Sequence, residues 1–453
     1  MRDLAENEGP YLIGLDLGTS AVKGVLTDAG GAVLAEATAE TQLLQPRDGW
    51  AEVDPEQHYR KVCSVIRQLA ASAPGPVGAL AMAAASGNTL LTEADGKPLT
   101  NIINWMDRRA EQKPPAVLAG LTGEVVSQIT GWPCTSSFPL AHLAWLKENA
   151  PQTFRRAAHV GMDTDWLIFR LTGTWRMDHS TATTFHLQEQ VSRRYYAPFL
   201  DRLGLRPDQL SELDESGVPV GALCARAAAD TGLAETTVVV TGCFDHPAAA
   251  RAVGVLGAGQ LMFSCGTSWV GFTPHPDRQA LVDAKMLCDP FLSAGEGLWA
   301  GMFSVPCIGR TIDWYIDNVI APGEADKMRL FDEAAAQAEP GAGGVVIDLR
   351  EPPRPLRASR ANVSRAVMEG ASRLLNEKLQ ELRPKGFRYD RVVMVGGPSR
   401  SQVWSEIVAE TTGLAVTTNG RSAGARGAAL LAGVGIGLAR DGHPLQHCER
   451  SAK

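Results

Sequence analysis

Three apolar runs separated by glycine-containing turns stand near the start of the chain. They are Tyr11–Leu15, Val22–Thr27 and Ala32–Glu36, with Gly18 in the first turn and Gly30-Gly31 in the second. Runs of this length, joined by short glycine turns, are typical of neighbouring antiparallel strands. We therefore expect the chain to begin with a three-stranded antiparallel sheet.

The apolar spacing then changes to that of a helix followed by a buried strand. Asp54 fits the N-cap, Pro55 fits the first helical position, and Gln57 would complete a capping box. The apolar residues that follow at helical spacing are Tyr59, Val62, Ile66 and Leu69. Val77–Ala83 is almost wholly apolar, as expected of a strand covered on both faces. This order of elements predicts a mixed α/β fold.

The second half of the chain has a similar order. A buried strand is expected at Thr237–Val240, and a helix opens at Asp245. The later elements are strands at Gln260–Ser264, Trp269–Phe272 and Arg391–Val395, and a helix at Gln402–Thr412 that Gly413 ends. Residues 322–355 are rich in Ala, Gly and Pro and are expected to be partly loop. Because 453 residues exceed the usual size of one domain, we predict two domains, 1–240 and 241–453.

Charge and composition exclude several classes of partner. The net charge is −7 and no long basic run occurs, so nucleic acid is not an expected partner. The N-terminal segment is acidic and polar, unlike a targeting signal. The longest apolar stretch, about residues 427–439, is too short and too rich in glycine to span a bilayer, so no membrane partner is expected. The eight cysteines are scattered without a Cys-x-x-Cys pair, which favours reduced thiols in a cytoplasmic protein.

A Gly-Thr-Ser phrase occurs twice, each time between two expected strands. The first copy is Gly18-Thr19-Ser20, preceded by Asp16, and the second is Gly266-Thr267-Ser268. Glycine at a hairpin tip lets the backbone approach a ligand, and the following residues offer N–H and hydroxyl donors. Two such turns facing each other would hold a polyphosphate, and Asp16 is suited to a hydrated magnesium ion. The alternative is two ordinary hairpins in which glycine only makes the turn.

Two further segments resemble signatures of the FGGY carbohydrate kinase family, a branch of the actin-like ATPase superfamily. Residues 137–149 resemble the first signature, with His142 where the family usually has lysine, and residues 362–370 resemble the second half of the other. The resemblance runs from Tyr11 to about Ala439 and points to the xylulokinase-like branch. It implies two ribonuclease-H-like domains around a deep cleft. It also implies ATP-dependent phosphorylation of a hydroxyl on a small sugar, ketose or polyol, and a possible homodimer.

The resemblance also implies a nucleotide site with magnesium. Asp16 would hold the metal through water, and phosphate oxygens would meet Gly18, Thr19 and Ser20 in the first turn and Gly266 and Thr267 in the second. Lys23 would either approach the phosphates or lie solvated on its strand. A third turn, formed by Gly396, Gly397, Pro398 and Ser399, would lie against the adenosine and the α-phosphate. Its alternative is a simple strand-to-helix turn, and Pro398 removes one N–H where the family usually has glycine.

Asp245 follows a buried strand in Thr-Gly-Cys-Phe-Asp-His. By its position in the family it resembles the catalytic base. A neutral alcohol is a poor nucleophile, and an aligned carboxylate accepts its proton as the bond to phosphorus forms. The other interpretation is a helix cap, and one aspartate can serve both purposes. His246 stands where the family often has asparagine, and it is expected either to touch the substrate or to pack.

The sugar side is assigned by resemblance alone. Asn88, Thr89 and Leu90 occupy the place of a family segment in which xylulokinases carry a histidine, so a standard xylulokinase pocket is not expected. Trp105 and Asp107 lie in a segment that resembles the family's Trp-x-Asp-x-Arg segment. Both would suit a sugar contact, because an indole ring stacks on sugar C–H surfaces and a carboxylate accepts hydrogen bonds from sugar hydroxyls. Core packing of Trp105 and an ion pair of Asp107 with a nearby arginine are the alternatives.

Two other functions remain open at this point. The same scaffold serves ATPases whose closure moves a partner, although Asp245 and the sugar-side segments oppose this. The second is a weakly active sugar-binding pseudokinase, suggested by Pro398 and the incomplete second signature. The sequence does not name the sugar.

Overall fold

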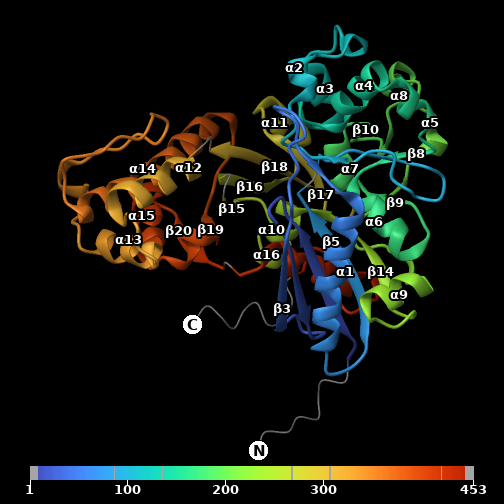
Figure 1. Ribbon diagram of the computed structural model, residues 1–453. Coiled ribbons are helices and arrows are strands. Elements are labelled where there is room, and N and C mark those ends of the chain that lie inside the picture. Colours follow the sequence, from blue (N-terminus) through green and yellow to red (C-terminus); the bar gives the residue numbers. More distant parts are fainter. Residues whose placement is uncertain are drawn as a thin grey trace, which may run out of the picture. The chain divides into compact units, whose positions relative to one another are not determined.

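The computed structural model describes residues 9–85, 87–133, 136–266, 269–305, 308–419 and 421–443. The chain forms two compact units. Unit 1 comprises Met1–Gly254, Leu287–Gly297 and Ser422–Lys453, and unit 2 comprises Val255–Met286 and Leu298–Arg421. Each unit has its own large sheet with helices packed on it, so the mixed α/β prediction is confirmed (Figure 1).

The sheet of unit 1 has the strand order β13-β14-β5-β1-β2-β3. Its strands are β1 (Tyr11–Leu17), β2 (Ala21–Thr27), β3 (Val33–Glu40), β5 (Val77–Ala84), β13 (Pro219–Ala222) and β14 (Val238–Phe244). The first three strands are antiparallel neighbours, as predicted, while β5 runs parallel to both β1 and β14. Strands β1 and β14 therefore end at the same edge of the sheet, and this brings Asp16 and the residue after β14 to one place.

Helices cover both faces of this sheet. On one face, α1 (Pro55–Ala71) and α6 (Asp163–Thr172) pack on inward-pointing residues such as Ile13 and Leu15. On the other face, α10 (Asp245–Ala252) and α16 (Ala423–Gly435) pack on Leu12 and the alanines of β5. The second contact is very close, because a Cβ at Gly14 would lie 1.9 Å from the carbonyl oxygen of Ala425. Only small residues allow a helix to approach a strand so closely.

The remainder of unit 1 is a helix-rich region with a separate core. Its helices are α2 (Arg109–Gln112), α3 (Gly123–Thr130), α4 (Pro139–Asn149), α5 (Pro151–Arg156), α7 (His179–Phe185) and α8 (Ala197–Leu203), whereas α9 (Ala225–Thr231) packs into the core of the large sheet through Ala227. Its short strands are β4 (Glu52–Val53), β6 (Leu90–Thr92), β7 (Ile102–Ile103), β8 (His159–Gly161), β9 (Arg176–Asp178), β10 (Gln188–Glu189), β11 (Arg194–Tyr195) and β12 (Glu212–Asp214), and β17 (Leu287–Leu292) also belongs to unit 1. Leu143, Phe185 and Phe199 are among the side chains that fill the core of this region.

The strands of unit 2 follow the order β18-β16-β15-β19-β20. They are β15 (Gln260–Cys265), β16 (Trp269–His275), β18 (Leu298–Val305), β19 (Arg391–Gly396) and β20 (Ala415–Thr418). The helices are α11 (Arg278–Asp283), α12 (Ile308–Tyr315), α13 (Lys327–Ala336), α14 (Arg360–Leu382) and α15 (Gln402–Thr412). Trp404 of α15 packs between Trp269 and Phe331, at ring-centroid distances of 5.3 and 5.7 Å.

The predicted ends of two helices can be compared with the structure. Asp54 caps α1 by accepting from the backbone N–H of Gln57 at 2.7 Å, but the Gln57 side chain donates to Gln42, so the capping box is only half present. Helix α15 spans the predicted residues, and Gly413 ends it with a left-handed φ of 69°.

The compact units do not follow the predicted boundary after residue 240, because β14 crosses it and α16 packs in unit 1. No helix in the described ranges is long and apolar enough to cross a membrane.

Candidate active site

The first Gly-Thr-Ser phrase makes a tight turn between β1 and β2. The N–H of Gly18 donates to the carbonyl of Ala21 at 3.0 Å, and a Cβ at Gly18 would lie 3.0 Å from that oxygen. The N–H of Thr41 donates to the carbonyl of Ser20 at 2.9 Å and anchors the turn from β3. Ser20 itself is exposed, and Lys23 is exposed opposite Asp16 in the strand pair. The turn is thus rigid, and its tip is open to a ligand.

Asp245 lies close enough to Asp16 to affect the charge of the Asp16 carboxylate. Burial, and then the negative charge of Asp245, raise the pKa of Asp16 to about 7, although Lys23 and His246 oppose the shift. No hydrogen bond to the Asp16 carboxylate from the described residues is found. A buried carboxylate whose pKa is strongly raised by burial and by a specific charged neighbour is a typical feature of a catalytic site.

Asp245 is the first residue of α10, and one of its oxygens is already engaged. Its Oδ1 accepts from the backbone N–H of His246 at 2.6 Å and from Nδ1 of the same residue at 2.5 Å. Burial disfavours the charged imidazole, but the carboxylates of Asp245, Asp16 and Asp289 outweigh it and raise the pKa of His246. The Oδ2 oxygen has no hydrogen-bond partner among the described residues. The predicted base therefore has a fixed orientation and one free oxygen.

Ser180 and Asp289, which the sequence analysis did not single out, support the segment that carries Asp245. The hydroxyl of Ser180 accepts from the backbone N–H of Phe244 at 3.1 Å and donates to Asp289 at 2.7 Å. Asp289 is itself 1 % exposed. No sequence pattern connected these residues with Asp245, because they come from α7 and β17, far along the chain.

Helix α16 also reaches the site. A Cβ at Gly424 would lie 2.7 Å from Oδ2 of Asp16, so the carboxylate rests against the first turn of this helix. The backbone N–H groups at a helix N-terminus favour a negative charge. The small-residue run that begins at Ala423 was visible in the sequence, but its position beside Asp16 was not.

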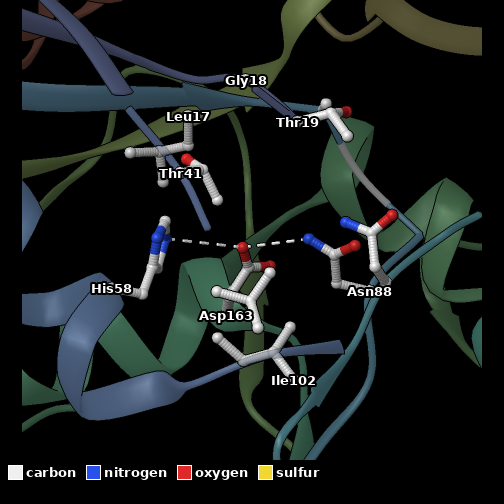
Figure 2. A pocket seen from close by; sticks show the side chains of 11 residues that line it. Leu17, Gly18, Thr19, Thr41, His58, Asn88, Ile102 and Asp163 are labelled. Atoms are coloured by element: carbon white, nitrogen blue, oxygen red, sulfur yellow. Dashed lines mark hydrogen bonds and ion pairs between the residues drawn. The ribbon is translucent and has the colours of Figure 1, made fainter. Parts of the chain in front are cut away.

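Two sugar-side residues are joined to the first turn by hydrogen bonds. Nε1 of Trp105 donates to the hydroxyl of Thr19 at 2.9 Å, and its backbone N–H donates to Oδ1 of Asn88 at 3.1 Å. Nδ2 of Asn88 in turn donates to Asp163 at 3.0 Å. Figure 2 shows Asn88 and Asp163 side by side beneath the Gly18-Thr19 turn. Trp105 and Asn88 thus lie beside the first turn.

Three other predicted sugar contacts have structural partners instead. Asp107 is fully buried, and Arg109 engages both of its oxygens at 2.8 Å, which is the ion pair considered as the alternative. Leu90 is 1 % exposed within β6. Thr89 is fully buried and shares a hydrogen bond of 3.0 Å with Nδ1 of His142. In this structure none of the three presents a free group, because each side chain is turned into the protein.

In unit 2, the turn after β19 has the predicted form of strand, turn and helix. Gly396 has a φ of 96°, and a Cβ there would lie 2.3 Å from the carbonyl oxygen of Cys265. The hydroxyl of Ser399 donates to the Gly396 carbonyl at 2.7 Å and closes the turn, and Gly397 has open space beside it. Pro398 stands in the first turn of a short 3-10 helix, where an N–H has no internal acceptor, so proline does not disturb the turn. Gly266 is exposed at the end of β15, and Thr267 lies outside the described residues.

Comparison with known proteins decides the family. Residues 11–252 match the N-terminal domain of the FGGY family of carbohydrate kinases, and residues 332–436 match its C-terminal domain. The chain belongs to this family. The FGGY assignment agrees with the resemblance seen in the sequence, and it makes the protein an ATP-dependent carbohydrate kinase.

The FGGY relatives cover almost the whole chain. The autoinducer-2 kinase of Salmonella typhimurium is 28% identical over 98% of this chain and 90% of its own length. The xylulose kinase of Bacillus subtilis is 28% identical over 94% of this chain and 88% of its own. The solved xylulose kinase of Rhodospirillum rubrum has a TM-score of 0.82 at 25% identity, with 94% of this chain and 90% of that one covered. The two-domain actin-like ATPase fold is therefore confirmed.

A magnesium ion fits the residues present in this FGGY kinase. The Asp16 carboxylate accepts no hydrogen bond from a described residue, and burial beside Asp245 makes its charge unfavourable until a cation offsets it. No group of three metal-binding side chains occurs among the described residues. Magnesium typically keeps several waters and uses one or two carboxylates together with substrate phosphates. The donor set therefore suits a hydrated magnesium ion carried with a nucleotide better than a permanent metal site.

Proposed function

We propose that this FGGY kinase transfers the γ-phosphoryl group of ATP to a hydroxyl of a small sugar, ketose or polyol, with Asp245 as the base. The observation that carries the proposal is the geometry of Asp245. His246 holds one oxygen at 2.5 Å, and no described residue hydrogen-bonds the other; the negative charge of Asp245 also acts on Asp16. A carboxylate with one anchored oxygen presents the second in a defined direction, as a general base requires.

The reaction needs little covalent chemistry from the protein. The sugar hydroxyl oxygen attacks the γ-phosphorus, the bond to the bridging oxygen of ADP breaks, and the hydroxyl proton passes to Oδ2 of Asp245. The imidazole of His246 keeps Oδ1 occupied, so the carboxylate does not rotate away. Asp16 would hold magnesium through water, and the metal supplies charge neutralisation for the phosphates when bound.

Nucleotide contacts are proposed on both units, each considered by itself. In unit 1 the phosphates would meet Gly18, Thr19 and Ser20, whose turn is anchored by Thr41. In unit 2 the proposed contacts are Gly266, Thr267, Gly396, Gly397 and Ser399. Gly397 suits an approaching base or phosphate, because nothing in the protein lies within 4 Å of the place where a side chain would begin.

For the sugar we propose contacts with Asn88, Trp105 and His246. The relatives act on different compounds by name, namely autoinducer-2 and xylulose, so the family alone does not select one. We also propose that the protein works in the cytoplasm, where the buried thiols of Cys63, Cys243 and Cys265 would stay reduced. A homodimer is proposed from the family resemblance only.

The decisive experiment combines a substrate panel with one substitution. ADP release is measured with ATP, magnesium and single sugars, polyols or sugar acids, and the best acceptor is then used with Asp245→Asn. We expect turnover to fall by about 100-fold to 10,000-fold, the usual contribution of a positioned base, while nucleotide affinity stays within about two-fold.

Asp28→Asn is a suitable control, because Asp28 lies in the turn after β2, at the other end of that strand from the Gly18-Thr19 turn. Near-normal turnover of the Asp245→Asn variant would remove Asp245 from its role. ATP turnover that no acceptor increases would instead favour an ATPase that acts on a partner.

A further inference from the structure

A small polar cavity lies directly beneath the first phosphate turn. Its volume is about 20 Å³, and the polar residues around it include Thr19, Thr41, His58, Asn88, Asn104 and Asp163. Figure 2 shows the Leu17–Thr19 turn above the cavity, with His58 on one side of Asp163 and Asn88 on the other. All of these residues belong to unit 1. Neither the family match nor the proposed reaction assigns a role to His58, Thr41 or Asp163.

Four polar atoms around the cavity have no hydrogen-bond partner among the described residues. They are Oγ1 of Thr41, both ring nitrogens of His58, and Oδ1 of Asp163. The residues His58 and Asp163 are 5 % and 4 % exposed, so bulk solvent does not satisfy them. Buried polar groups are almost always hydrogen-bonded, and leaving one unpaired is unfavourable. Several orphan atoms gathered around one space therefore indicate a shared partner.

His58 and Asp163 do not form a hydrogen bond with each other. Nε2 of His58 lies 3.8 Å from Oδ2 of Asp163, which is too long for a hydrogen bond. Burial lowers the pKa of His58 to about 4, so the ring is neutral near pH 7. Burial raises the pKa of Asp163 to about 6, which leaves the carboxylate largely ionised there. Asn88 donates to Oδ2 of this carboxylate, so Oδ1 is the oxygen that has no donor among the described residues.

We propose that this cavity binds one internal water molecule, which donates to Oδ1 of Asp163 and bridges it to His58 and Thr41. The size agrees, because about 10 to 15 Å³ suffices for one water, and a buried water typically makes two to four hydrogen bonds. A water both donates and accepts, which matches a carboxylate, a hydroxyl and an imidazole. A polar contact beyond about 3.5 Å, such as that between His58 and Asp163, is where a bridging water is expected.

The water would connect the sugar side to the phosphate turn. From Asp163 a chain of hydrogen bonds leads through Asn88 and Trp105 to the hydroxyl of Thr19. From Thr41 the backbone N–H leads to the carbonyl of Ser20. The bound water would join these two sets of hydrogen bonds and would thereby help to fix the position of the turn. This consequence for ATP rests on the proposed function, whereas the binding of the water does not.

The test compares two threonines that differ in one respect. The hydroxyls of Thr41 and Thr27 are both buried and unpaired, but only Thr41 lines the cavity. Thr41→Val removes a partner of the water, while Thr27→Val removes an orphan hydroxyl and leaves the cavity unchanged. We expect Thr41→Val to lower the melting temperature by about 1 to 2 °C relative to Thr27→Val, and to raise KM for ATP by about five-fold.

A high-resolution crystal structure of the ligand-free protein provides the direct measurement. The proposal expects density for one water within about 2.7 to 3.2 Å of Oδ1 of Asp163. A dry cavity, or identical melting temperatures of the two valine variants, would overturn it. Melting temperatures that differ among sodium, potassium and choline chloride would also overturn it, in favour of a monovalent cation. The map and the melting temperatures do not depend on phosphoryl transfer, so they stand even if the sugar kinase assignment of Asp245 fails.

Discussion

Replacing Gly424 with alanine would place a methyl group against the carboxylate of Asp16. The new Cβ would lie 2.7 Å from Oδ2 and 2.9 Å from Cγ of Asp16, whereas ordinary contacts begin at 3.4 Å. The oxygen would have to retreat by about 0.7 Å to reach that distance. Because Gly424 is the second residue of α16, the helix backbone cannot yield easily, and the carboxylate side chain moves instead.

The expected effect follows from the precision that such a site needs. Catalytic groups must be held within about 0.5 Å of their productive position, and a misplacement of about 1 Å can lower the rate by about 100-fold. A shift of the size given above should therefore reduce kcat/KM by about ten-fold to 100-fold. Stability should change little, since the contact is relieved by movement of the end of the Asp16 side chain rather than by movement of the backbone.

The assay measures binding of magnesium and a non-hydrolysable ATP analogue by calorimetry, together with ADP release over a magnesium titration. The loss should be largest at low magnesium, because Asp16 is proposed to hold that ion. Gly433→Ala in the same helix is the matched control, since the nearest atom to its Cβ would be the end of the Leu12 side chain at 3.0 Å, with Ala439 and Leu438 at ordinary contact distances. If Gly424→Ala folds normally and keeps the magnesium dependence of the wild type, the role of Asp16 at the metal is refuted.

Three further predictions concern Asp16, Arg109 and Gly396. The pKa of Asp16 is raised to about 7 in the folded state, so ionisation of this carboxylate destabilises the metal-free protein progressively as the pH rises from about 4 to 7. Asp16→Asn should therefore raise the melting temperature most at pH 8. An equal increase at pH 4 and pH 8 would contradict this. Arg109→Met leaves the carboxylate of Asp107 buried without its partner and should destabilise the protein by about 3 to 5 kcal/mol in denaturant unfolding, with little change in sugar KM for the folded fraction. Gly396→Ala places a Cβ 2.3 Å from the Cys265 carbonyl oxygen at a φ of 96°, so calorimetry should show weaker nucleotide binding, and unchanged affinity would remove this turn from the site.

Local sequence was sufficient for the elements that carry the proposed chemistry. Strands β1 and β2, the turn at Gly18 and the helix that begins at Asp245 were all predicted, because glycine turns and strand periodicity act over a few neighbouring residues. The position of Asp245 at the end of a buried strand was also readable, since such an apolar run is recognisable by itself. These local patterns, with the family resemblance, were enough to indicate a phosphotransferase.

Tertiary structure alone decided which polar side chains are free. Asp107 and Thr89 looked equivalent to Asn88 as sugar contacts, yet Arg109 and His142 occupy them inside the protein. A sequence shows that a residue is polar, but its hydrogen-bond or ion-pair partner depends on which segments pack against it in the folded protein.

The same reason applies to the surroundings of Asp16. Gly424 makes room for its carboxylate from a helix more than 400 residues later in the chain. The cavity that groups Thr41, His58 and Asp163 likewise draws on three separate segments. The sequence by itself determined the strands, the glycine turns and the acidic residues, whereas the partners and the free oxygens were decided by packing between segments distant in the chain, which short-range patterns do not encode.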